Sequence, residues 1–177
     1  MALLQVGPTL DYKLHRLPKL ISNRVPNLNV RITPPVMTIG EAINTLRGQY
    51  HSTRIMAILE NHPSLAEFDK SLGVTSMDLY NPNPKADGKG FVFGEARLSG
   101  RSGIVSTFRL GASSPSNLIF ESRVKKEVVH ELGHMVGLEH CSSPRCVMYQ
   151  SVDVEDTDAK TDDYCDRCEV AVKELHR

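Results

Sequence analysis

Four residues in one short segment could bind a metal and activate water: His130, Glu131, His134 and His140. His130 and His134 are four residues apart, so on a helix their imidazoles project from the same face, one turn apart. That separation lets two nitrogens bind one zinc ion, and a carboxylate beside the first histidine can reach a zinc-bound water. The segment therefore predicts a catalytic zinc site in which Glu131 is the general base.

A catalytic zinc needs three protein ligands and one open position. A helix that continued past His134 would carry His140 away from the metal. Gly137 can adopt the left-handed conformation that ends a helix, so we expect the active-site helix to end at Gly137 and the chain to turn there. His140 is then the expected third ligand.

All four cysteines follow residue 140 and form two local pairs, Cys141 with Cys146 and Cys165 with Cys168. Thiolates with this spacing predict a closed tetrahedral zinc site, which is structural rather than catalytic. A disulfide or a redox-active Cys165–Cys168 pair is the alternative. Because Cys141 directly follows His140, a metal bound by the cysteines would also fix the position of the third histidine. Two zinc ions are therefore expected.

The signature from His130 to His140 resembles that of the metzincin clan of zinc peptidases, and Met148 resembles the methionine of the clan's tight turn below the metal. Ordinary core packing is the alternative for Met148. Together with the cysteines, the segment from His130 to Cys168 is similar to the archaemetzincin family. The resemblance implies hydrolysis of peptides or proteins, with a leaning toward aminopeptidase-like action. It also implies an extended substrate beside an edge strand; residues 91–98 are the candidate, although they could equally form an interior strand.

The elements that must position these residues are predicted from periodicity. An apolar stripe predicts a helix over residues 118–136; it consists of Leu118, Val124, Val128, Leu132 and Met135. Strands are expected at 28–32, 74–80, 91–98 and 104–110, the last two as an antiparallel hairpin. Helices are expected at 38–61, with a possible break at Gly48, and at about 163–175.

This order predicts an α/β (α+β), metzincin-like fold: a mixed twisted sheet backed by two helices, then a small irregular C-terminal subdomain with a final helix. Residues 1–177 are expected to form one metallopeptidase domain. Its N-terminal subdomain would be 1–137, and its C-terminal subdomain, 138–177, would hold the third histidine, the Met-turn and the cysteine site.

Composition excludes several classes of protein. The 177 residues include 21 basic and 21 acidic ones, without a basic stripe, so nucleic acid is not an expected partner. No apolar run is long enough to span a membrane, and the N-terminus lacks the basic region of a signal peptide, which predicts a cytoplasmic protein. The acidic stretch 153–163 is interpreted as a solvated loop. Tyr149 is interpreted as a packing residue, and the other histidines, which lack partners at ligand spacing, as structural, although His51 could lie near the cleft: His15, His51, His62 and His176.

Two other functions stay open. One is a non-catalytic, zinc-stabilised protein that binds peptides, although such a protein has no need of the carboxylate of Glu131. The other is a metal-dependent hydrolase of a non-peptide amide or ester.

Overall fold

The computed structural model describes residues 1–83, 90–112 and 114–175. Its main sheet has five strands in the order β2-β1-β5-β8-β7. Four of them are parallel, and β7 runs antiparallel to β8 at the edge. The strands are β1 (Ala2–Gln5), β2 (Arg31–Ile32), β5 (Ser71–Thr75), β7 (Gly94–Ala96) and β8 (Ser102–Ser106). The predicted mixed sheet is therefore confirmed.

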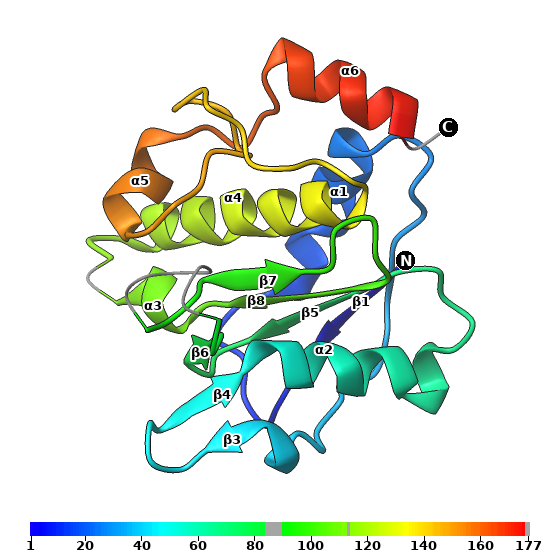
Figure 1. Cartoon of the computed structure of the whole chain (residues 1–177), viewed down its shortest axis with the longest axis vertical. Helices are drawn as coiled ribbons and strands as arrows, with labels where there is room; N and C mark the ends of the chain where they lie inside the picture. The colour runs from blue at the N-terminus through cyan, green and yellow to red at the C-terminus, as the bar shows by residue number, and fades with distance from the viewer. Residues whose placement is uncertain (84–89, 113, 176–177) are drawn as a thin grey trace.

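Helices cover both faces of this sheet (Figure 1). On one face lie α4 (Asn117–Met135) and α1 (Pro18–Arg24), and on the other lies α2 (Ser52–Asn61). Because successive side chains of a strand point to opposite faces, Leu3 joins the core under α4 while Leu4 joins the core over α2. The sheet thus separates two apolar cores, and α4 packs against one of its faces.

Helix α4 carries the site and matches its predicted bounds closely. The Ser116 hydroxyl caps its N-terminus by accepting a hydrogen bond from the Ile119 amide at 3.3 Å. The predicted stripe is buried from Val124 to Met135, but Leu118 is 80% exposed because it lies in the first turn, beyond the core. Gly137 has a φ of +107°, a conformation that favours glycine, and the chain turns away there as expected.

The predicted helix at 38–61 is wrong in its first half. Only α2 is an α-helix there; before it come a short 3-10 helix, η2 (Gly40–Ala42), and a hairpin of β3 (Ile43–Asn44) and β4 (Gln49–His51). Gly48, with a φ of +67°, lies in the hairpin turn. Strand β4 also pairs with β6 (Leu79–Tyr80), and this long-range pairing outweighs the helix-like spacing of the apolar residues.

Several predicted strands are shorter than expected. The predicted strand at 74–80 divides into the end of β5 and the separate β6, and the one at 104–110 ends with β8, after which α3 (Phe108–Gly111) begins. The segment 28–32 forms only the two-residue β2. The antiparallel hairpin of β7 and β8 is confirmed, and β7 is an edge strand, although it covers only three residues of 91–98. Strand β1 and helix α1 were not predicted.

The tail after α4 is irregular apart from two helices, α5 (Val154–Ala159) and the expected α6 (Asp166–Leu175). Helix α5 corrects the interpretation of 153–163 as a solvated loop. Its N-terminus is capped by the Asp153 carboxylate, which accepts from the Asp156 amide at 3.0 Å, and acidic residues in its first turn complement the helix dipole.

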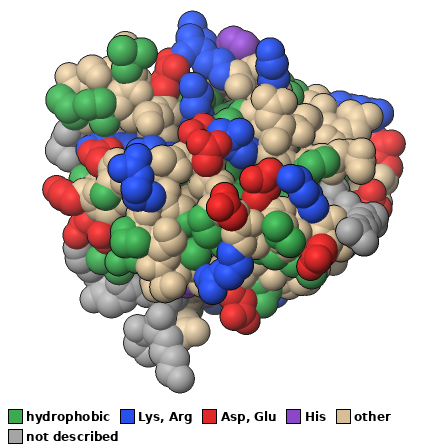
Figure 2. Space-filling view, turned by 90° about the horizontal axis from the view of Figure 1, so that it is seen from above, with side chains coloured by type: hydrophobic (Ala, Val, Ile, Leu, Met, Phe, Trp, Pro, Cys, Tyr) green, Lys and Arg blue, Asp and Glu red, His purple; other side chains and the backbone are tan. Residues whose placement is uncertain are grey.

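Acidic and basic side chains are interspersed on the face that carries this tail (Figure 2). None of the described helices has the length and apolarity needed to cross a membrane.

Candidate metal centre and active site

His130 and His134 are oriented by two backbone carbonyl groups. His130 Nδ1 is 2.8 Å from Val147 O, and His134 Nδ1 is 2.7 Å from Leu138 O. A carbonyl oxygen only accepts hydrogen bonds, so each Nδ1 must carry the proton and each neutral ring presents a bare lone pair at Nε2. The two Nε2 atoms are 3.1 Å apart. Two bare lone pairs at that distance repel unless a cation lies between them.

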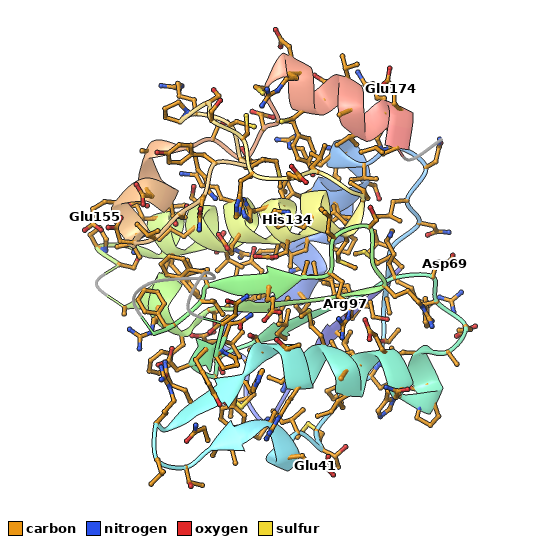
Figure 3. The ribbon with its side chains drawn as sticks, in the orientation of Figure 1. Glu41, Asp69, Arg97, His134, Glu155 and Glu174 are labelled. Carbon is orange, nitrogen blue, oxygen red and sulfur yellow. The ribbon has the colours of Figure 1, made fainter. Side chains whose placement is uncertain are left out.

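The turn at Gly137 brings His140 back to this pair. In Figure 3, His134 lies between strand β7 and the chain that follows α4. The centroid of the His140 ring is 5.3 Å from that of His130 and 4.9 Å from that of His134. Ligand nitrogens of the three rings lie within 4.8 Å of one another, and ligands at about 2.1 Å from a tetrahedral zinc are roughly 3.4 Å apart. The donor set, its spacing and its tautomers fit zinc.

Burial favours the neutral form of His130 and His134, which is the form that binds a metal, whereas His140 is more exposed. Desolvation lowers the pKa of His134 to about 4 and holds the pKa of His130 well below its ordinary value, with the nearby Lys160 ammonium adding to the effect on His130. The pKa of His140 is lowered mainly by burial and then by Lys160. Protons therefore do not compete with a metal for these nitrogens near neutral pH.

Glu131 lies beside the histidines with its side chain buried. Strand β7 approaches it so closely that a Cβ atom added to Gly94 would be 2.5 Å from Glu131 Oε1. Burial raises the pKa of Glu131 well above the usual range, and the carboxylates of Glu127 and Glu95 raise it further. Among the residues the structure describes, Glu131 Oε2 is a buried atom without a hydrogen-bond partner.

Glu131 and the histidines line one cavity of about 290 Å³ between β7 and the chain after α4. The residues before β7, Phe91, Val92 and Phe93, form an apolar wall, and Glu95 of β7 adds a carboxylate. Residues 150–152 line the side formed by the chain after α4. Glu127, one helical turn before Glu131, also lines it. The cavity is therefore a cleft with the metal ligands and a carboxylate on its floor.

Met148 lies in a tight turn directly after Val147, whose carbonyl contacts His130. The Tyr149 amide donates to Cys146 O at 2.9 Å across this turn, and the Met148 carbonyl accepts from the Cys141 amide at 2.9 Å. The Met148 side chain is fully buried and packs against Gly133 of α4, where a Cβ atom would overlap its sulfur. Met148 is thus buried at a tight turn, and its role as the Met-turn residue stays a prediction.

The four cysteines meet in a second cluster, and all are free thiols. Their sulfur atoms lie within 4.8 Å of one another, so the predicted pairs converge on one point rather than forming a disulfide. Burial favours a raised pKa at Cys141, but hydrogen bonds, beginning with the one from the Ser143 amide, lower its pKa to about 7. A thiolate is thus accessible near neutral pH, and a closed set of four sulfurs fits a structural zinc.

Several residues that shape the site were not predicted. Glu127 is four residues before Glu131, and this spacing could have placed both on one face of α4. The Val147 carbonyl, the close approach of Gly94 and the buried Lys160 have no local sequence signal, because each depends on contacts between distant segments. The Leu138 carbonyl is only four residues from His134, but a backbone carbonyl is common to every residue type.

Of the other histidines, the described His15, His51 and His62 are not among the residues that line the cleft. The His51 ring packs 5.3 Å from Tyr80, His62 contacts the Ser64 hydroxyl at 2.8 Å, and His15 is exposed. His176 lies outside the described residues.

A mixed sheet with an active-site helix, three convergent histidines and an adjacent glutamate defines a zinc metallopeptidase, with a catalytic zinc site at the histidine triad. The model of peptidase family M54 matches residues 20–174. The chain belongs to the archaemetzincin family.

The relatives agree in sequence and structure. The archaemetzincin of Archaeoglobus fulgidus is 37% identical over 160 residues, which span 90% of this chain and 88% of that protein. The crystal structure of archaemetzincin from Methanopyrus kandleri gives a TM-score of 0.84 at 32% identity, covering 99% of this chain and 94% of that one. The structure of the Archaeoglobus fulgidus protein, complexed with malonate, gives 0.79 at 33% identity, covering 96% and 98%.

Proposed function

We propose that this metallopeptidase hydrolyses peptide bonds with Glu131 as the general base. The observation that carries the proposal is the buried carboxylate of Glu131, whose Oε2 has no partner among the described residues and which lines the same cavity as the three histidines. A zinc ion bound by His130, His134 and His140 supplies Lewis acidity to a carbonyl group and to water. Glu131 then accepts the proton of the attacking water and passes it to the leaving amine.

The electrostatics around Glu131 suit this role. Burial, Glu127 and Glu95 raise its pKa, which makes the Glu131 carboxylate a stronger proton acceptor. Glu127 has a raised pKa for the same main reason, burial. The narrow contact with Gly94 limits where the Glu131 carboxylate can lie, and it thereby holds the base in place.

We infer that the substrate binds as an extended strand along β7. This strand is at the edge of the five-stranded sheet and pairs with β8 on one side, and β7 together with the residues before it, Phe91–Phe93, lines the cleft. Backbone groups of an edge strand can pair with an added chain, and the aromatic wall suits an apolar side chain. We further propose aminopeptidase-like action, which is supported by the small volume of the cavity and by the resemblance of this chain to the archaemetzincin family.

We also propose a two-part organisation, with residues 1–137 and 138–177 as subdomains on either side of the cleft. A cytoplasmic location is supported by four free thiols gathered at one point, since a reducing compartment keeps such a set available for metal.

The test is cleavage of a peptide library by the zinc-loaded full chain. We expect cleavage that a chelator abolishes and added zinc restores, with unblocked peptides cleaved at least tenfold faster than the same peptides acetylated at the N-terminus. Equal rates would refute aminopeptidase-like action, and the absence of any chelator-sensitive cleavage would refute the peptidase proposal in favour of peptide binding alone.

A further inference from the structure

Lys160 is a fully buried lysine close to the metal centre. Its side chain is 0% exposed, although it lies in the most acidic stretch of the chain. Burying an ammonium group costs several kcal/mol unless it is paired and hydrogen-bonded. The buried Lys160 ammonium therefore needs partners that offset the cost of its desolvation.

The Lys160 ammonium contacts two elements of the site. It donates to the Tyr149 carbonyl at 3.1 Å, directly after the Met-turn, and it is 3.9 Å from Glu127 Oε2 on α4. Glu127 Oε2 is otherwise a buried atom without a hydrogen-bond partner among the described residues. One side chain thus connects the chain after the Met-turn to the active-site helix.

The segment that Lys160 holds is the one that orients His130. Val147 is two residues before Tyr149, and its carbonyl accepts the Nδ1 proton of His130 at 2.8 Å. Lys160 Nζ is itself 3.5 Å from His130 Nδ1, but that nitrogen already donates to Val147. Besides the direct proximity of its charge, Lys160 therefore acts on the orientation of the ring through the backbone of residues 147–149.

Contacts between α5 and α4 fix where Lys160 lies. Arg123 forms a bidentate pair with Asp158, at 2.7 and 2.8 Å, and Lys126 donates to the carbonyls of Thr157 and Asp158 at 3.0 and 3.1 Å. Lys126 is also buried, but among the described residues its ammonium donates to these two carbonyls and not to the Tyr149 carbonyl or the Glu127 carboxylate. Substituting each lysine in turn therefore distinguishes the docking of α5 on α4 from the support of the metal centre.

We propose that Lys160 is a positioning residue of the histidine metal centre, which clamps the Tyr149 carbonyl to Glu127 and thereby sets the orientation of His130. The inference rests on the histidine triad binding a metal, and it assigns to the tail a direct part in that binding. Partners of metal-ligating histidines typically change metal affinity 10- to 100-fold when they are removed. Since Lys160 acts through one further residue, we expect the lower end of this range.

The test compares Lys160→Met with Lys126→Met in the full chain, using Co²⁺ titration as the probe. The near-ultraviolet charge-transfer bands report thiolate ligands alone, and a chain whose cysteine site already holds Zn²⁺ leaves the visible Co²⁺ bands to the histidine site, so the two sites are followed separately. We expect Lys160→Met to weaken Co²⁺ binding at the histidine site about tenfold and to alter its visible spectrum, with the thiolate bands unchanged. Lys126→Met should bind within twofold of the wild type.

Wild-type affinity and spectrum in Lys160→Met would overturn the proposal, as would an equal loss in both variants, which would mean that only the docking of α5 matters. If Lys160→Met does not fold, Glu127→Gln carries the test, with about a threefold loss expected and an unchanged affinity refuting the clamp. A wild-type chain whose cysteines bind Co²⁺ while its histidines do not would instead refute the proposed function itself.

Discussion

Gly94 determines how closely strand β7 approaches the proposed general base, so Gly94→Ala should separate catalysis from folding. The three atoms nearest to a Cβ at this position all belong to Glu131, with Oε1 at 2.5 Å and Cγ at 2.8 Å. Ordinary van der Waals contact requires roughly 3.5 Å, so the carboxylate must retreat by about 1 Å. A displacement of that size costs about 100-fold in rate, or about 2.7 kcal/mol of transition-state stabilisation.

The fold should tolerate this change, because the atoms that must move are at the end of one side chain. We expect a stability loss of about 1 kcal/mol in urea unfolding and an unchanged zinc content. The assay is kcat/KM on a peptide selected from the library, with zinc measured in the same samples. Gly40→Ala is the matched control, since a Cβ there meets nothing within 4 Å. A Gly94→Ala enzyme within threefold of the wild type, or one that has lost its zinc, would refute the reasoning.

Three further perturbations should have distinct effects. Gly133→Ala places a Cβ against the Met148 sulfur and should lower the free energy of unfolding by about 1–3 kcal/mol. This loss is expected even though alanine has a higher helix propensity than glycine. A gain in stability in urea unfolding would contradict the close packing of Gly133 against Met148. Cys165→Ser should reduce bound zinc from two to about one per chain and lower the Tm sharply, because closed thiolate sites contribute roughly 10 kcal/mol to folding; an unchanged Tm would exclude a structural metal. In the metal-free protein the folded-state pKa of His134 is depressed from 6.5 to about 4 by burial, so its contribution is full above pH 6.5 and is lost as the pH falls toward 4. That loss should reach about 3 kcal/mol in urea unfolding and should shrink in His134→Ala; an equal loss in both proteins would contradict the assignment.

The parts of the fold that could be predicted are those set by local physics. Helix α4 has a cap at Ser116, a continuous apolar stripe and a glycine after its end, and all three signals agree. The hairpin at 43–51 was missed because its apolar residues repeat as in a helix, while its pairing with β6 comes from residues almost 30 positions away. Strand β1 is short and buried on both faces, so it shows no alternation.

The site also contains residues that local sequence predicts and residues that it does not. Metal ligands are set by spacing along the chain, so the three histidines and four cysteines could be predicted from the sequence and converge in the structure. The groups that orient the histidines and Glu131 have no such spacing: two backbone carbonyls, a glycine on the edge strand, and a lysine from the tail. Every residue type has a backbone carbonyl, so the sequence does not mark the two that contact the histidines. The contacts of Lys160 form only when α5 is docked on α4.

The most direct test of peptide hydrolysis at this centre compares the wild type with Glu131→Gln at equal zinc content. The substitution keeps the size of the side chain and touches none of the metal ligands, so both proteins should bind two zinc ions per chain. We expect the variant to lose at least 100-fold in kcat/KM, within the range typical of removing a general base. Cleavage at the wild-type rate by a fully zinc-loaded Glu131→Gln protein would contradict the proposed mechanism.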